Sequence, residues 1–128
     1  MCRYLKAFSS FSTNDLAAAR KFYAEDLAIE VKAQDHFLEL QIGEQEVLIY
    51  PKDNHEPATF TVLNFYVQDL EKEVAALKQK GVPFESYDTP DIKTNEQDIL
   101  EDPAMQMKIA WFKDPAGNIL SLIEQQKH

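Results

Sequence analysis

The chain carries the same strand-and-helix pattern twice. Residues 8–23 read FSSFSTNDLAAARKFY and residues 62–77 read VLNFYVQDLEKEVAAL. In both copies an alternating stretch, typical of a strand, runs into Asp-Leu, which opens a helix with an apolar stripe. The offset is constant, because the two helix-opening aspartates, Asp15 and Asp69, lie 54 positions apart. Two copies in 128 residues predict a small domain built from two paired modules, with function expected where the modules face each other.

Composition limits the class of protein. The chain is 45% hydrophobic and has 14 aromatic residues (eight Phe, five Tyr, one Trp), enough for a sizeable core. Its net charge of −9 comes from scattered acidic residues, so we expect no binding to nucleic acid or to an anionic membrane. Cys2 is the only cysteine, which excludes an intrachain disulfide and favours a reducing compartment. No apolar run approaches the length of a membrane span, and no signal-peptide core is recognised, so a soluble cytoplasmic protein is expected.

The first module is predicted over about residues 4–50. An alternating stretch at 4–13 predicts a strand, and Asn14 or Asp15 can cap the helix that follows, whose apolar stripe includes Phe22 and Tyr23. Three short strands are then predicted, with Gly43-Glu44 as the turn of the last hairpin: 28–33, 36–42 and 46–50. The polar segment 51–58 (PKDNHEPA), which has two prolines, is predicted to be the linker.

The second module is predicted over about residues 59–125. Its strand runs from Thr59 to Val67, and its helix runs from Leu70 to Lys80 and ends at Gly81. A strand is expected near 83–87, followed by the long irregular stretch 88–104, which is either a functional lid or a solvated insertion. The chain closes with a hairpin, MQMKIAWF and ILSLIEQ, joined by the turn at residues 113–118. Each module therefore has one strand, one helix and three more strands.

Three segments carry a family resemblance: DLAAARKFYAEDLAIEV, DLEKEVAALKQKGVPFE and, most specific, FKDPAGNILSLIEQ. The chain resembles the vicinal oxygen chelate superfamily, which includes glyoxalase I, bleomycin-resistance proteins and extradiol dioxygenases, over roughly residues 5–125. The resemblance implies a single α+β domain over 1–128, in which two paired βαβββ modules form a cupped mixed sheet. It also implies a homodimer as a common state. Whether the modules pair within one chain or swap between chains stays open.

Metal-dependent members of the family use four strand positions as metal ligands. By the resemblance these positions fall on Phe8, Val62, about Tyr50 and Glu124, the acid near the end of the last strand. One carboxylate cannot hold a catalytic divalent ion, which needs about three protein ligands. We therefore expect no metal site and no cofactor.

The remaining histidines do not restore a metal site. His36 and Glu39 alternate to opposite faces of a strand, His55 lies in the polar linker, and His128 is the last residue, so surface or tail histidines are expected. The sequence also lacks a nucleophile elbow, a phosphate-binding glycine loop and a CxxC motif.

By the resemblance, the alternating side chains of the paired strands form two rows, and one of these rows lines the cup. One row should pack on the helices and includes Phe11 and Phe65; the opposite row should line the cavity. The predicted ligand-binding residues, with Ser12 beside them, are Phe8, Ser10, Tyr50, Val62, Asn64, Tyr66, Trp111 and Glu124. Apolar walls with a few polar groups are typical of a small-molecule pocket. Trp111 is equally compatible with the core, and Phe8 and Val62 with a cup that is simply filled.

Glu124 is the one candidate catalytic residue. Among Phe8, Val62 and Tyr50 its pKa would be raised, or it would hydrogen-bond to the Tyr50 hydroxyl. It would then serve as an acid–base group or anchor a cation; alternatively it is a solvated leftover at a strand end.

Three functions are compatible with these residues. The first is a metal-independent binding protein of the bleomycin-resistance type, whose partner is a small aromatic or cationic molecule. The alternative is a glyoxalase- or dioxygenase-like enzyme (a lyase, isomerase or oxidoreductase) with a displaced metal site or with Glu124 as its acid–base group. The third is a structural or regulatory dimer with a filled cup.

Overall fold

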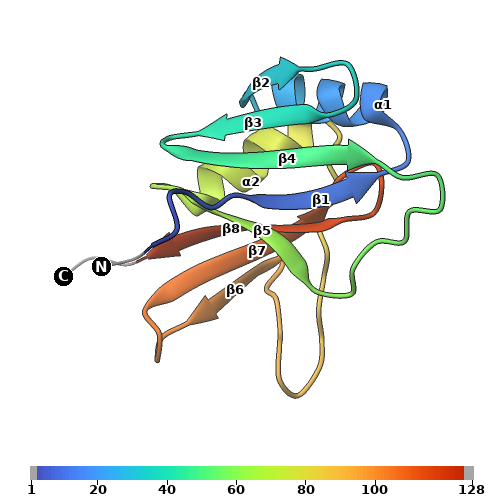
Figure 1. The fold of residues 1–128 in the computed structure, drawn as a ribbon. Coiled ribbons are helices and arrows are strands. Elements are labelled where there is room, and N and C mark those ends of the chain that lie inside the picture. The colour runs from blue at the N-terminus through green and yellow to red at the C-terminus, as the bar shows by residue number, and fades with distance from the viewer. Residues whose placement is uncertain (1–2, 126–128) are drawn as a thin grey trace. The chain divides into compact units, whose positions relative to one another are not determined.

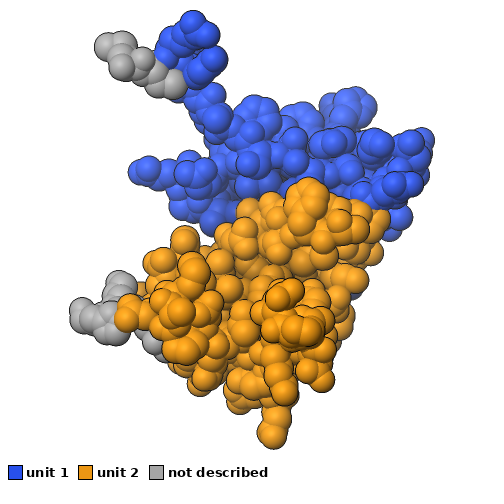
Figure 2. Space-filling model, turned by 90° about the horizontal axis from the view of Figure 1, so that it is seen from below, with its two compact units in different colours: residues 1–56 blue, residues 57–128 orange. Residues whose placement is uncertain are grey.

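The computed structural model describes residues 3–125, so the predictions made for Cys2 and His128 lie outside the described residues. The chain divides into two compact units, residues 1–56 and 57–128, shown in different colours in Figure 2. The boundary between them falls inside the segment 51–58 that the sequence marks as a linker. Among the described residues, no helix is both long and apolar enough to cross a membrane.

Unit 1 contains a four-stranded sheet with one helical segment (Figure 1). Its sheet has the order β1-β4-β3-β2, in which β1 is parallel to β4 and the other neighbours are antiparallel. The elements are β1 (Ser9–Thr13), α1 (Leu16–Lys21), the π-helix η1 (Phe22–Asp26), β2 (Glu30–Ala33), β3 (Leu38–Ile42) and β4 (Gln45–Pro51). The hairpin turn between β3 and β4 is confirmed, with Gly43 at φ +57°.

The first helix begins where its cap is predicted. The Asp15 side chain accepts a hydrogen bond from Ala18 N at 3.0 Å, which satisfies one of the free N–H groups of the first turn. Its apolar stripe, including Phe22 and Tyr23, is buried, and the Tyr23 ring lies 6.3 Å from that of Phe11 on β1. The prediction that Phe11 faces the helix is thereby confirmed.

The first strand is shorter than predicted. It begins at Ser9, not at residue 4, and the preceding side chains are exposed, with Leu5 at 102% and Phe8 at 58% of their full accessibility. The reason is that β4 is the only strand paired with β1 in this unit, and β4 begins at Gln45 after the turn at Gly43. Residues 3–6 therefore have no strand of unit 1 to pair with.

Unit 2 repeats the arrangement with the order β5-β8-β7-β6, where β5 is parallel to β8. Its elements are β5 (Thr61–Tyr66), α2 (Leu70–Gln79), β6 (Ile99–Asp102), β7 (Met107–Lys113) and β8 (Ile119–Gln125). The predicted α+β class and the βαβββ order of both modules are confirmed. Asp69 caps α2, and the buried stripe of α2 (Leu70, Val74 and Leu77) packs where the helix contacts β7 and β8.

Two strand predictions in unit 2 are wrong. Residues 83–87 form no strand, because their ladder is reduced to a single bridge between Phe84 and Phe112, and the predicted irregular stretch 88–104 contains β6. The edge of β7 explains both results: residues 107–110 of β7 pair with β6, which leaves only the end of that edge for Phe84. A strand prediction from sequence does not include which sheet edge is free for the strand to pair with.

The turn between β7 and β8 is a closed hydrogen-bonded loop. The Asp114 carboxylate accepts from the backbone N–H of Ala116 and of Asn118, and the Asn118 amide donates to Asp114 Oδ2 at 2.9 Å. Both side chains are buried, and Gly117 has φ +85°, a conformation that favours glycine. The Asp-Pro-x-Gly-Asn motif thus fixes the register of the final hairpin.

Candidate functional site

The two faces of the unit 2 sheet differ in their chemistry. Side chains alternate along β8, so Leu120, Leu122 and Glu124 share the face on which α2 packs, whereas Ser121 and Ile123 lie on the opposite face. Strand pairing adds neighbours to this second face: Ser121 lies opposite both Asn64 of β5 and Trp111 of β7, and Ile123 lies opposite both Tyr66 and Ile109. We call this set the Trp111 face; its members are Asn64, Tyr66, Ile109, Trp111, Ser121 and Ile123.

The Trp111 face combines a polar pair with an aromatic pair. Ser121 is fully buried and its hydroxyl donates to the side-chain oxygen of Asn64, which is exposed. Trp111 is half-buried and makes an edge-to-face contact with Tyr87, with ring centroids 5.3 Å apart at 89°. This face thus presents the Asn64 amide and the Trp111 indole, and the buried Ser121 hydroxyl orients the amide.

Tyr87 belongs to the connection between α2 and β6. Burial raises the pKa of the Tyr87 phenol above its ordinary value of 10.0, with the Glu85 carboxylate adding to the rise. The segment is held in place by bonds between Tyr87 N and Thr94 Oγ1 (2.9 Å) and between Glu85 N and Trp111 O (2.8 Å). At neutral pH this phenol is therefore a fixed neutral group beside the indole.

Two other predicted residues of unit 2 are Tyr66 and Val62. Tyr66 lies on the Trp111 face but is 71% exposed. Val62 is half-buried at an irregularity of the ladder between Thr61 and Leu63, so strand pairing does not assign it to a face.

Glu124 faces α2, not the Trp111 face. Its Oε1 accepts a hydrogen bond of 2.8 Å from the backbone N–H of Leu70, the first residue of that helix. Within unit 2 its partner is therefore a helix N-terminus, where the helix dipole also favours a carboxylate. The alternation of ILSLIEQ explains this position, because Glu124 lies three residues from Ser121 and so on the other side of β8.

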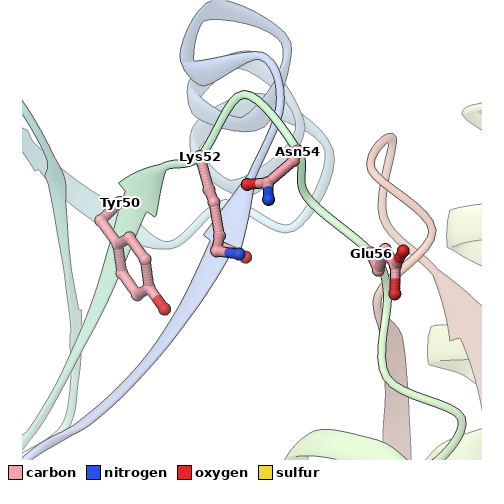
Figure 3. Close-up of a pocket in the computed structure, with 5 residues that line it drawn as sticks. Tyr50, Lys52, Asn54 and Glu56 are labelled. Atoms are coloured by element: carbon pink, nitrogen blue, oxygen red, sulfur yellow. The ribbon is translucent and has the colours of Figure 1, made fainter.

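In unit 1 the predicted residues lie on the sheet face opposite Phe11. Ser10 is exposed, and Ser12 pairs directly with Tyr50 across β1 and β4. Ser12 and Tyr50 line an open pocket of about 360 Å³ with Lys52, Asn54 and Glu56 from the segment after β4 (Figure 3). Phe8 precedes β1 and is not among the residues that line this pocket.

His55 differs from its expected role as a surface histidine. It is half-buried, and its Nδ1 lies 2.6 Å from Ser12 Oγ. His36, by contrast, is exposed as predicted. Among residues 3–125, no group of three or more His, Cys, Asp or Glu side chains is arranged to hold a metal ion.

Sequence reasoning missed several residues of these surfaces: Ser121, Tyr87, Lys52, Asn54 and Glu56. Ser121 was detectable, because the alternation that buries Leu120 and Leu122 turns it to the other face. Tyr87, Lys52, Asn54 and Glu56 lie in segments without periodicity, where no pattern reports the direction of a side chain.

Comparison with known proteins assigns the family. The model of the Glyoxalase/Bleomycin resistance protein/Dioxygenase superfamily matches residues 8–122, and the chain belongs to this superfamily. No curated protein matches the sequence.

Solved structures of relatives share the fold over nearly the whole chain. A putative glyoxalase family protein from Bacillus anthracis is 20% identical, with a TM-score of 0.71, over 98% of this chain and 100% of that one. A lactoylglutathione lyase from Agrobacterium tumefaciens is 19% identical (TM-score 0.67; 96% of each chain), and a fosfomycin resistance protein from Listeria monocytogenes is 15% identical (TM-score 0.72; 98% and 96%). At these identities the likeness extends to the fold alone.

Proposed function

We propose that this protein binds a small, semi-polar organic molecule on the Trp111 face of unit 2, without a metal ion. The observation that carries the proposal is the arrangement around Ser121, where the Asn64–Ser121 hydrogen bond lies beside the Trp111–Tyr87 contact. Rigid aromatic surface supplies contact area, and a few oriented polar groups give specificity, which is the usual makeup of a small-molecule site.

The identity of the side chains supports binding without a metal. Phenylalanine and valine have no donor atoms, and the neutral phenol of a tyrosine is a weak ligand, so Phe8, Val62 and Tyr50 offer little to a divalent ion. The Glu124 carboxylate bonds to the N-terminus of α2, which gives it a structural task. These facts favour a binding protein like the bleomycin-resistance members of the superfamily, and a cytoplasmic homodimer remains our expectation for its assembly.

The enzyme alternative has weaker support. It depends on Glu124 as an acid–base group or on a displaced metal site, and the contact of Glu124 with Leu70 N favours neither. We therefore retain a glyoxalase- or dioxygenase-like activity only as an outcome of the test below.

The test uses the only tryptophan of the chain as its reporter. Protein treated with a chelator is titrated with a panel of aromatic amines and alkylated aromatic ammonium ions while Trp111 fluorescence is recorded, and bound metal is measured by elemental analysis. We expect a saturable change in emission for at least one compound in metal-free protein. In thermal-shift assays, Trp111→Leu should abolish stabilisation by that compound.

A matched control is Phe60→Leu, which removes an exposed aromatic side chain that precedes β5. It should bind the compound like the parent protein. Near-stoichiometric metal that survives desalting, together with binding only in its presence, would overturn the proposal and favour the enzyme alternative.

A further inference from the structure

A second candidate site lies entirely within unit 1. Its pocket of about 360 Å³ is lined by Ser12 and Tyr50 on neighbouring strands and by Lys52, Asn54 and Glu56 on the segment that follows β4. Figure 3 shows Tyr50 on one side, Glu56 on the other, and Lys52 and Asn54 pointing inward between them. The lining therefore contains one cation, one anion and three neutral polar groups, and nearly all of it is polar.

The two charged groups of this pocket do not neutralise each other. Lys52 and Glu56 are four residues apart and face the same pocket, yet neither takes part in any of the four ion pairs found among residues 3–125. An ammonium and a carboxylate that line one pocket without pairing leave room for a ligand between them. A ligand should bind this pocket most tightly when it carries both a negative group for Lys52 and a positive group for Glu56.

The backbone beneath these side chains is fixed by the strands. Lys52 N donates to the Thr13 carbonyl at 2.9 Å, and His55 N donates to the Lys52 carbonyl at 3.0 Å. The His55 ring bonds to Ser12 on β1, which ties the far end of the segment to the same strand. The positions from which Lys52 and Glu56 project are thus set before any ligand arrives, which lowers the cost of binding.

We propose that this pocket binds a small zwitterion that carries a carboxylate and an ammonium group, such as an amino acid. The carboxylate lies at Lys52 and the ammonium at Glu56, and the Asn54 amide and the Tyr50 hydroxyl hydrogen-bond to these two groups of the ligand. A simple anion meets Glu56 and a protein of net charge −9, and a simple cation meets Lys52, so each is disfavoured relative to the zwitterion. The pocket is open to solvent, so the expected affinity is in the millimolar range.

The experiment follows backbone amides by two-dimensional NMR of the ¹⁵N-labelled full chain. The probes are glycine, 4-aminobutanoate and 6-aminohexanoate, a zwitterion series of increasing length, with hexanoate and hexylammonium as singly charged analogues. We expect at least one zwitterion to shift the amides of Ser12 and of residues 52–56 at millimolar concentration. The analogues should shift them more weakly, by roughly two- to fivefold in affinity for each missing charge contact.

Variants that reverse the charges of Lys52 and Glu56 test the proposed charge contacts directly. Lys52→Glu and Glu56→Lys should each weaken binding of the zwitterion, and the double variant should restore it, because a site with exchanged charges still has one of each sign. Matched controls are Lys32→Glu and Glu44→Lys, exposed residues of unit 1 that do not line the pocket.

Three results would overturn the inference: no shift at residues 52–56 with any zwitterion, equal affinity for hexanoate or hexylammonium, or a double variant that does not recover. Each is separable from a failure of the proposed function, since that function is read from Trp111 emission with aromatic ligands and this site from amides of unit 1.

Discussion

The two helices begin with the same Asp-Leu pair, but different side chains accept hydrogen bonds from their first N–H groups. In unit 1, Thr13 lies opposite Pro51, and the Thr13 hydroxyl accepts from Asp15 N at 3.2 Å. In unit 2 the equivalent of Thr13 is Val67, which has no such hydroxyl, and Glu124 on the neighbouring strand accepts from Leu70 N instead. The free N–H groups at a helix start need hydrogen-bond acceptors. In unit 1 the acceptor is on the first strand, β1, and in unit 2 it is on the last strand, β8.

The units also differ in the connection from helix to sheet. In unit 1 only residues 27–29 separate η1 from β2, whereas in unit 2 residues 80–98 separate α2 from β6. The longer connection supplies Tyr87 to the Trp111 face and is held by its own contacts. A repeated fold thus keeps its sheet order while the connections acquire the residues that distinguish one module from the other.

The largest expected difference concerns the first apolar residue of each helix. Leu70 is fully buried, whereas its counterpart Leu16 is only half-buried. Leu70→Ala should lower the free energy of unfolding by about 2–5 kcal/mol, and Leu16→Ala by about 1 kcal/mol, because the cost follows the apolar area and cavity created. Urea unfolding of both variants measures this; equal losses would show that the helices are packed alike.

The next largest losses of unfolding free energy are expected for Glu124 and Thr13, which accept hydrogen bonds at the two helix starts. Glu124→Gln keeps an acceptor for Leu70 N but loses the charge, so we expect a loss of about 1 kcal/mol in unfolding free energy. Thr13→Val leaves Asp15 N without its hydroxyl partner, at a similar cost of about 1–2 kcal/mol.

A carboxylate introduced into unit 1 at the position of Glu124 tests whether the two acceptors are interchangeable. Adding Pro51→Glu to Thr13→Val places a carboxylate where unit 2 has Glu124, within reach of Leu16 N, the equivalent of Leu70 N. This new bond should offset part of the stability lost at Asp15 N, as measured by thermal denaturation. Glu124→Gln with unchanged stability but weaker ligand binding would instead return Glu124 to the functional role that its sequence position suggested.

The successes of sequence analysis lie where local chemistry decides the structure. The capping aspartates Asp15 and Asp69, the turn at Gly43 and the Asp114–Asn118 loop each fix a boundary through contacts within a few residues. Such local signals, together with the 54-residue offset of the two aspartates, are sufficient for the fold class and for the order of the elements.

The sequence-based predictions are wrong or incomplete where the structure depends on a residue that is distant in the sequence. Residues 83–87 can form a strand, yet β6 occupies most of the β7 edge that they would need. His55 looks like a solvated linker residue until Ser12, 43 positions away, proves to be its partner. The resemblance places Glu124 at a metal-ligand position, and its bond to Leu70 N, 54 positions away, is a contact that no local pattern predicts.

Removing either capping aspartate should lower the free energy of unfolding by nearly the same amount in the two units. Asp15→Ala and Asp69→Ala each remove one side-chain bond to the first helical turn, with expected losses of about 1 kcal/mol. Circular dichroism during denaturation measures them. If Asp15→Ala costs clearly less, the short α1 is held mainly by η1 and its buried aromatic residues, and not by its cap.

The smallest effect concerns Asp98, which anchors the long connection that only unit 2 has. Burial pushes the pKa of this carboxyl up, but the hydrogen bond from Ser86 and the ion pair with Lys78 at 3.0 Å outweigh it, so the pKa is lowered from 3.8. A lowered pKa contributes stability above the unfolded value, and this contribution is lost as pH falls through the folded value. Asp98→Asn should therefore cost less than about 1 kcal/mol at neutral pH.

The pH dependence separates this charge effect from a change in packing. Asn tolerates the positive φ of position 98, so the backbone should be unchanged, and the deficit of Asp98→Asn should shrink below pH 3.8 and vanish below the folded pKa. Asp91→Asn, an exposed residue of the same connection, is the matched control and should follow the parent curve. A deficit that persists in acid would mean that Asp98 acts through its shape and its bond to Ser86, and that the long connection owes nothing to the charge of Lys78.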